Sequence, residues 1–212
     1  TGNNLDNIQG LFSIKNARLT NTEKSVVIDS VLLKAVGIGK ERLLALTSNV
    51  GDAQIKGEYD LNTLPSAFKT IVKKYIPSYR ATIVKPKNQN FEFRVDLKNF
   101  DYLSSLFIPE LKIPERGALF GKFNSSKDSV SLNGFVKTLT YAGKTFSNII
   151  IDQNTNNKSM EAIISMDKLE LSEGGLFVQN IIIQNTLRND SLTFNVKLSD
   201  KDAINQLDLY GL

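Results

Sequence analysis

Enzyme chemistry in this sequence would need a pair of carboxylates or an activated lysine, because histidine and cysteine are both absent from its 212 residues. Histidine is the side chain whose ordinary pKa suits proton transfer near neutral pH, and it is the commonest metal ligand. The lack of cysteine removes thiolate nucleophiles, thiolate metal sites and disulfides. The carboxylates are scattered, mostly over the polar faces of predicted strands. The sequence therefore predicts no catalytic residue and no cofactor.

One segment, DQNTNNK, partly matches a calcium-binding loop. Asp152, Asn154 and Asn156 occupy the first, third and fifth ligand positions. The sixth position holds Asn157 instead of glycine, and the twelfth holds Ile163 instead of a bidentate glutamate. The segment is therefore interpreted as a polar hairpin turn, and no metal site is predicted.

The formal net charge is +4, and the basic residues are spread along the chain. The tightest groups are Lys69, Lys73 and Lys74, and then Lys85 and Lys87. A nucleic-acid-binding protein usually has a denser basic stripe with aromatic residues for stacking on bases. The charge is therefore interpreted as a solvated positive surface, and no nucleic-acid partner is expected.

The elements that would position any functional side chain are mostly strands. In NFEFRVDLK, residues 90–98, apolar and charged side chains alternate, which gives a strand one apolar and one charged face. Many strands joined by short polar turns, such as GIGK and NSSKD, predict an antiparallel meander. Similar alternation predicts further strands at 8–19, 24–36, 40–48, 53–59, 117–123, 129–141, 144–152, 158–171, 176–186 and 190–198.

A helix is predicted near 63–76, where the apolar residues recur at helical instead of strand spacing. Thr63 is the predicted N-cap, Pro65 suits the first turn, and Pro77 prevents continuation. The helix would be amphipathic, with one apolar side made of Leu64, Phe68, Ile71, Val72 and Tyr75.

A second short helix is predicted near 99–107, with Asn99 as its cap and Pro109 as its stop. A further helical turn is expected close to the C-terminus. No run approaches ~18 consecutive apolar residues, so no membrane-spanning helix is predicted. The residues that would share one side of the C-terminal turn are Ala203, Ile204 and Leu207.

Two architectures satisfy this pattern. Either two sheets bury each other as a closed sandwich, or one sheet curls and leaves an apolar groove accessible. In 130–141 and 167–175 the alternation is irregular, so the positions that face inward there stay open. The fold class predicted is mainly β, a curled antiparallel meander with one or two short amphipathic helices.

Several motifs between about residues 43 and 136 occur in a fixed order. A serine-containing strand, LTSNVGDA, precedes the apolar-x-Gly-x-aromatic strand IKGEY. An amphipathic helix then begins at LP and ends at YIP. A later strand runs into a short helix closed by IP, and the G-x-F strand GKF follows. In these features the chain resembles the TamB/AsmA-like envelope proteins, in the form found in Bacteroidota.

The resemblance implies a long β structure rolled like a taco and lined with apolar side chains. Residues 1–212 would be a single segment of this elongated groove, within a longer chain anchored in the inner membrane and extending through the periplasm. Members of this family are implicated in moving phospholipid between membranes and in outer-membrane biogenesis. The resemblance therefore implies phospholipid acyl chains and outer-membrane assembly proteins as partners, membrane contact through parts of the chain not present here, and no catalytic residues.

With this resemblance, the apolar strand faces become candidates for the lining of a lipid groove. The alternative is a closed β-sandwich that acts as a binding or adhesion module, with loops such as NTNN and NSSKD in recognition. A third reading is an envelope enzyme that acts on polysaccharide through two carboxylates. The groove candidates are Phe91, Phe93, Val95, Leu97, Met160, Ile164, Leu192, Phe194 and Val196.

Overall fold

The computed structural model describes residues 9–80, 82, 87–156, 158–172, 174–199 and 206–211. Two helices, α1 (Leu64–Tyr75) and α2 (Phe100–Phe107), and two short 3₁₀ turns, η2 (Gly39–Glu41) and η3 (Ser125–Lys127), accompany the strands. The strands are β1 (Gly10–Thr20), β2 (Ser25–Val36), β3 (Leu43–Ser48), β4 (Gly51–Glu58), β5 (Asn90–Leu97), β6 (Leu111–Lys112), β7 (Gly117–Asn124), β8 (Ser129–Tyr141), β9 (Lys144–Thr155), β10 (Met160–Glu170), β11 (Phe177–Arg188), β12 (Ser191–Ser199) and β13 (Gln206–Gly211).

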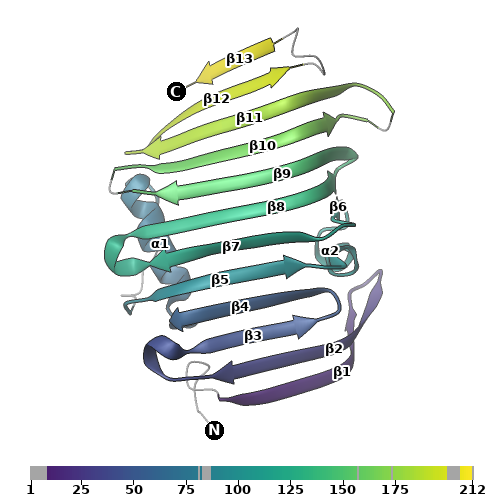
Figure 1. The fold of residues 1–212 in the computed structure, drawn as a ribbon, viewed down its shortest axis with the longest axis vertical. Coiled ribbons are helices and arrows are strands. Elements are labelled where there is room, and N and C mark those ends of the chain that lie inside the picture. Colours follow the sequence, from purple (N-terminus) through teal and green to yellow (C-terminus); the bar gives the residue numbers. More distant parts are fainter. Residues whose placement is uncertain are drawn as a thin grey trace.

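The described strands form one open sheet in which nearly every strand pairs with its neighbours in the chain (Figure 1). The order is β1-β2-β3-β4-β5-β7-β8-β9-β10-β11-β12-β13, and β6 pairs with β8 outside this path. All pairs are antiparallel. The predicted curled antiparallel meander is confirmed. The described strands do not divide into two facing sheets, so the architecture is not a sandwich.

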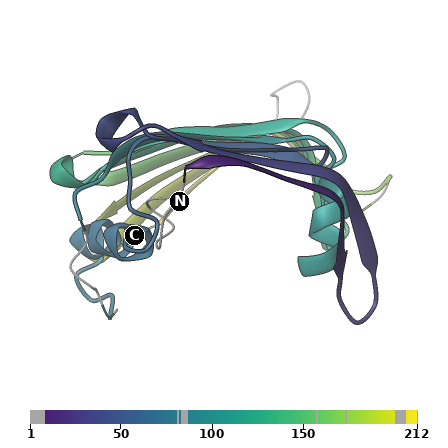
Figure 2. The same ribbon diagram turned by 90° about the horizontal axis from the view of Figure 1, so that it is seen from below.

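The sheet curves, and both helices lie on its inner side, near opposite ends of the strands (Figure 2). We call this inner side the concave face and the opposite side the convex face. Because directly paired residues in antiparallel strands share a face, the strand registers show which side chains point inward.

Asparagines in a left-handed backbone conformation lie inside three strands, with φ of 52° at Asn16, 52° at Asn148 and 50° at Asn180. Asparagine adopts this conformation more readily than most residues. The Asn148 amide donates to Asp167 Oδ2 of β10 at 2.7 Å, so neighbouring strands are interrupted at matching positions. Inward-facing residues on either side are three apart instead of two: Val136 and Leu139, Phe146 and Ile149, Met166 and Leu169, Val178 and Ile181.

Helix α1 begins where the sequence predicts it, but its N-terminus is held differently. Thr63 is at the N-cap position and makes no side-chain cap hydrogen bond. Its backbone N–H and its hydroxyl instead donate to Asp60 Oδ1, at 2.8 and 2.9 Å. The predicted role of the Thr63 side chain was therefore wrong, because the carboxylate of Asp60 is the acceptor that orders this turn.

The C-terminal end of α1 is tied to three hairpin turns. Lys74 forms an ion pair with Asp128, which follows η3, at 3.2 Å. The Tyr75 hydroxyl donates to the carbonyl of Asn156 at 2.7 Å, and the Tyr75 carbonyl accepts from the Asp190 N–H at 3.0 Å. These turns join β7 to β8, β9 to β10 and β11 to β12. Helix α1 therefore crosses the ends of several strands along one side of the sheet.

Helix α2 is held at the other end of the strands. Asn99 occupies the N-cap position but makes no side-chain cap hydrogen bond; its amide donates to the Asn49 carbonyl at 3.3 Å. The Asp101 carboxylate accepts from the backbone N–H of Ile113. The Asn21 amide, at the tip of the β1–β2 hairpin, donates to the carbonyl of Leu106 at 2.9 Å.

Two smaller predictions are refined by the structure. The GIGK segment is a turn as expected, with Gly37 at φ 88°, and it leads into η2. Leu207 lies in β13, so the expected helical turn is wrong at this residue, while Ala203 and Ile204 lie outside the described residues. Within the described ranges, neither helix has the length and apolar character needed to cross a bilayer.

Candidate functional site

The feature of the concave face that stands out is one row of paired residues that runs across twelve strands. We call it the central row, and neighbouring members are direct register partners. With about 4.8 Å between strands, the row is roughly 50 Å long. Its members are Phe12, Leu33, Leu46, Ala53, Val95, Leu119, Gly134, Ile151, Ile164, Ile183, Val196 and Leu209.

Every member of the central row is apolar, and eleven of the twelve keep part of their surface exposed. The buried member is Gly134, and an added Cβ there would lie 2.5 Å from Leu119 Cδ2. Neither helix interrupts the central row, because α1 and α2 cover positions on either side of it. A continuous apolar surface of this length is unusual for a sheet that faces only water.

Helix α1 covers the residues of the concave face that lie on one side of the central row. Phe91 and Phe123 are register partners and stack with ring centroids 5.1 Å apart. They are 4% and 0% exposed, and they pack with Ala67, Ile71 and Tyr75 of the helix and its end. These contacts form one wall of the concave face.

The opposite wall is built by the strand ends beyond the central row and by the segment that follows α2. Leu97, Val136 and Ile149 are buried here against Ile113. Phe100 and Leu111 pack against the same cluster. The concave face therefore has two sealed margins with partly exposed residues between them.

Two glycines of the concave face lie beneath large side chains of neighbouring strands. A Cβ added at Gly121 would lie 2.8 Å from the ring of Phe93 and 1.9 Å from the Ser131 carbonyl oxygen. A Cβ at Gly211 would lie 2.2 Å from the ring of Phe194. These large side chains therefore lie over a glycine of the next strand, and a larger residue at either glycine would meet the ring.

All nine predicted groove residues lie on the concave face. Phe91 and Leu97 are buried in the two walls. Between them on β5, Phe93 and Val95 are partly exposed. The residues on the later strands are also partly or largely exposed: Met160, Ile164, Leu192, Phe194 and Val196.

The convex face carries charged pairs across neighbouring strands. Glu92 lies opposite both Lys56 and Lys122, and its carboxylate is 2.7 Å from Lys122 Nζ. The hydrogen bond from Lys122 and then its charge lower the pKa of Glu92. The sequence pattern did not emphasise a group of exposed apolar residues on this face: Phe120, Phe135, Ile150, Ile163 and Ile182.

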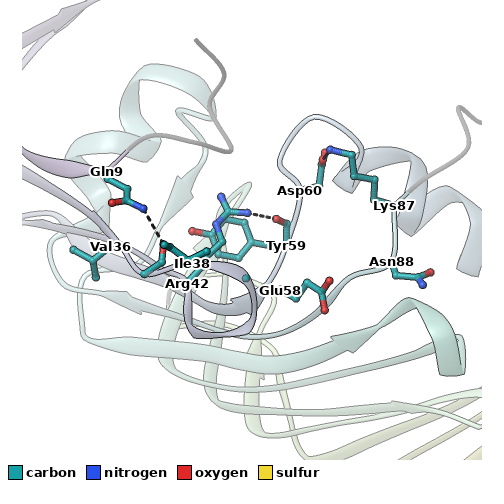
Figure 3. A pocket seen from close by; sticks show the side chains of 11 residues that line it. Gln9, Val36, Ile38, Arg42, Glu58, Tyr59, Asp60, Lys87 and Asn88 are labelled. Carbon is teal, nitrogen blue, oxygen red and sulfur yellow. Dashed lines mark hydrogen bonds and ion pairs between the residues drawn. The ribbon is translucent and has the colours of Figure 1, made fainter. Parts of the chain in front are cut away.

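A cavity of about 560 Å³, lined by polar and apolar residues, lies at one margin beside the β2–β3 turn and the end of β4 (Figure 3). Gln9 Nε2 donates to the Gly37 carbonyl at 3.3 Å. The guanidinium of Arg42 lies 4.1 Å from the centre of the Tyr59 ring and donates to the Tyr59 carbonyl at 2.5 Å. No sequence motif pointed to this cavity, because its residues come from four separate segments.

The charges of this cavity are largely matched internally. Lys87 forms an ion pair with Asp60, which points toward it in Figure 3. Burial raises the pKa of Asp60, but hydrogen bonds from Lys87 and Thr63 and the charge of Lys87 outweigh it and lower this pKa. The cavity therefore has the features of a structural polar network instead of a reactive site.

The partial calcium motif is divided between a strand and a turn. Asp152 and Asn154 lie in β9, where the Asn154 amide donates to Asp152 Oδ1 at 2.8 Å. The Asn156 side chain accepts from the N–H groups of Lys158 and Ser159, both at 2.8 Å, as in an Asx turn. The predicted hairpin turn is therefore observed at Asn156, whereas residues 152–155 of the segment belong to β9. Within the described parts of the chain, no three potential metal ligands are grouped.

Comparisons of this chain with protein-family models, with curated proteins and with solved structures give no match.

Proposed function

We propose that the concave face is a groove for the acyl chains of phospholipids, and that the protein is a non-enzymatic segment of a lipid conduit in the cell envelope. The observation that carries the proposal is the central row. It offers a hydrocarbon chain an apolar path across the whole sheet, while the walls near Phe91 and Leu97 are already filled by protein.

The energetic argument rests on apolar contact. Each CH₂ group moved from water to an apolar surface gains roughly 0.8 kcal/mol. A chain of on the order of fifteen carbons would gain about 12 kcal/mol as an upper bound, which offsets much of the cost of leaving a bilayer. No polar side chain interrupts the central row, so no specific anchor would hold a lipid at one place, and the lipid is free to slide.

The resemblance to TamB/AsmA-like proteins supports the cellular part of the proposal. The segment would work in the periplasm, within a longer chain anchored in the inner membrane. Its partners would be phospholipids and outer-membrane assembly proteins, and membrane contact would come through other parts of that chain. The proposal needs no cofactor and no nucleic acid.

The test is to express residues 1–212 in bacteria, purify the protein and identify bound lipid by mass spectrometry. Val95→Glu places a charge in the central row. Phe120→Glu is the matched control, because Phe120 is exposed on the convex face of the adjacent strand β7. We expect phospholipid with the unchanged protein and with Phe120→Glu, and at least a tenfold loss with Val95→Glu.

Circular dichroism and thermal unfolding must show that Val95→Glu stays folded. Absence of lipid from the unchanged protein, even after incubation with phospholipid vesicles, would reject the groove. Equal lipid loss in both variants would place binding somewhere other than the central row. A binding or adhesion module that recognises its ligand through loops would carry no lipid, and its ligand would respond to substitutions in the NTNN and NSSKD loops.

A further inference from the structure

The two margins of the concave face differ in charge. Helix α1 contains three lysines and no acidic residue, whereas α2 contains no basic residue and one acidic residue, Asp101. The sheet between the helices adds no charge. Within the described strands, the central row and the inward-facing rows that include Phe91 and Phe93 contain no charged residue. The concave face is therefore apolar in its middle and positively charged along the α1 margin.

One flank of α1 continues the apolar surface of the concave face. Lys74 pairs with Asp128 at the strand ends, which identifies the outer flank of the helix. The opposite flank carries Phe68, whose ring centroid lies 4.7 Å from that of Phe123 and whose residue surface is 37% exposed. Val72, four residues after Phe68, shares this flank and is half-buried. A hydrocarbon chain on the sheet would therefore also meet apolar side chains of the helix.

Lys69 and Lys73 lie beyond this apolar flank. Each follows one of its residues by a single position, about 100° further around the helix, so both lie on the side of α1 turned away from the sheet. They are four residues apart, which makes their side chains neighbours on the helix surface. Among the described residues, no acidic group forms an ion pair with either lysine. Both ammonium groups are therefore available to an anion.

A third cation, Arg80, lies just beyond the C-terminal end of α1. It lines an open cavity of about 570 Å³ together with Lys73. The acidic residue at this end of the helix, Asp190, accepts hydrogen bonds from the Ser78 N–H and hydroxyl, at 3.0 and 2.6 Å. Because α1 crosses the ends of several strands (Figure 1), Lys69, Lys73 and Arg80 follow one another in the direction of the central row.

The sheet also becomes more polar toward α1. Gln153 of β9 and Asn185 of β11 are half-buried, lie on either side of Ala162 in the register, and are two residues from the central row. The corresponding positions on the α2 side of the row are Ile149 and Ile181, which are buried and apolar. Side-chain amides donate hydrogen bonds, so the α1 side suits the ester carbonyls of a lipid better than the α2 side does.

We propose that the groove selects lipids whose head group carries a net negative charge. The hydrocarbon chains lie along the central row, and the glycerol esters lie near Gln153 and Asn185. The phosphate lies beside Lys69 and Lys73, with Arg80 as the next cation along the line. This inference rests on the proposed function, because it needs the concave face to hold hydrocarbon chains.

The selectivity follows from charge. A zwitterionic head group brings an ammonium group close to these cations, and the repulsion offsets the attraction of its phosphate. A head group with a net negative charge has no such penalty. Contacts with exposed cations are weak in water, so the head group passes from one cation to the next. The charge therefore selects the lipid without fixing it at one place.

The test compares two short, water-soluble lipids that differ only in head group: dihexanoyl-phosphatidylglycerol, which is anionic, and dihexanoyl-phosphatidylcholine, which is zwitterionic. Each is titrated into residues 1–212 below its micelle-forming concentration, and the affinity is measured from shifts of amide NMR signals. We expect about fivefold tighter binding of the phosphatidylglycerol lipid, because a few exposed ion pairs add modestly to affinity. Raising the salt from about 50 to about 500 mM should reduce the preference, since salt screens exposed charges.

Two double variants locate the preference. Lys69→Gln with Lys73→Gln should bind both lipids equally, with the affinity for the phosphatidylcholine lipid unchanged. The matched control is Lys34→Gln with Lys197→Gln, which removes the same charge from exposed positions next to central-row residues and therefore on the convex face. The control should keep the preference. Its loss there as well would trace the preference to the net charge of the protein and overturn the head-group site. Thermal unfolding checks that both variants stay folded.

The remaining outcomes separate the head-group site from the groove. Equal binding of the two lipids by the unchanged protein would overturn the head-group site and leave the groove in place. Binding of neither lipid would reject the groove and this inference together. Inorganic phosphate is the third probe, and it should bind at least about tenfold more weakly than the phosphatidylglycerol lipid, because it gains no contact with the central row. Equal binding of inorganic phosphate would show a site for the free anion, and the lipid assignment would be wrong.

Discussion

The residues beneath α1 and the residues of the central row follow the same alternating sequence pattern, but they differ in burial. Phe91 and Val95 lie on the same face of β5, four residues apart, in one alternating segment. Phe91 is sealed by a helix that is inserted between β4 and β5, and Val95 is left partly exposed. Alternation therefore tells which residues share a face, while the inserted helices decide which part of that face stays accessible.

The largest expected effect is on stability, and it differs between a substitution beneath α1 and a substitution in the central row. Phe123→Ala removes a fully buried ring that packs against Phe91 and Phe68, and it should lower the free energy of unfolding by about 3–5 kcal/mol. Leu119→Ala, in the partly exposed central row of the same strand, should cost ~1 kcal/mol. Urea denaturation of both variants measures the difference. Equal losses would show that the central row is as tightly packed as the α1 wall.

An intermediate effect is expected at the glycines of the concave face. Gly121→Ala brings a Cβ to within 1.9 Å of a backbone oxygen, so the strands themselves must move, at a cost of about 1–3 kcal/mol. Gly134→Ala meets a methyl group of Leu119, which can rotate away, so its cost should be smaller. Thermal unfolding of the pair tests the order, and a more damaging Gly134→Ala would contradict it.

The smallest effect concerns Asp60, whose carboxylate orders the turn at the start of α1, and this effect depends on pH. The pKa of Asp60 is lowered in the folded protein, so its carboxylate contributes stability above its ordinary pKa near 3.8, and this contribution is lost as the pH falls through the folded-state pKa. Asp60→Asn should cost about 1 kcal/mol at pH 7 and progressively less in acid. Unfolding midpoints of the variant and the unchanged protein are measured between pH 7 and pH 3. A difference in midpoint that stays constant over this range would contradict the prediction.

Much of the fold follows from the sequence, and the exceptions have physical causes. The helices predicted near 63–76 and 99–107 are observed at Leu64–Tyr75 and Phe100–Phe107, because proline positions and apolar spacing are local signals. The change from two to three residues between inward-facing positions at Asn148 was not predictable, because asparagine is also common in ordinary turns. Only the pairing of neighbouring strands shows that the regular alternation is interrupted there.

The candidate site was predictable in part. The nine residues proposed from alternation share the concave face, but burial of Phe91 and Leu97 depends on contacts with segments distant in the sequence. The helix caps show the same limit. Thr63 has a side chain suitable for an N-cap, yet its N–H and hydroxyl donate to the carboxylate of Asp60, three residues earlier. Asp60 lies outside the helical pattern, so the pattern did not point to it.

The attachment of α1 to the hairpin turns has a consequence for how the chain reaches its native state. The carbonyl of Tyr75 meets its partner N–H only once Asp190 has been synthesised, 115 residues later in the chain. Contacts of such high sequence separation slow folding, because a long loop must close before they form. The apolar side of this helix can pack against Phe91 and Phe123 well before Asp190 has been synthesised, so the fastening of its C-terminal end is a later step of folding than the burial of its apolar side.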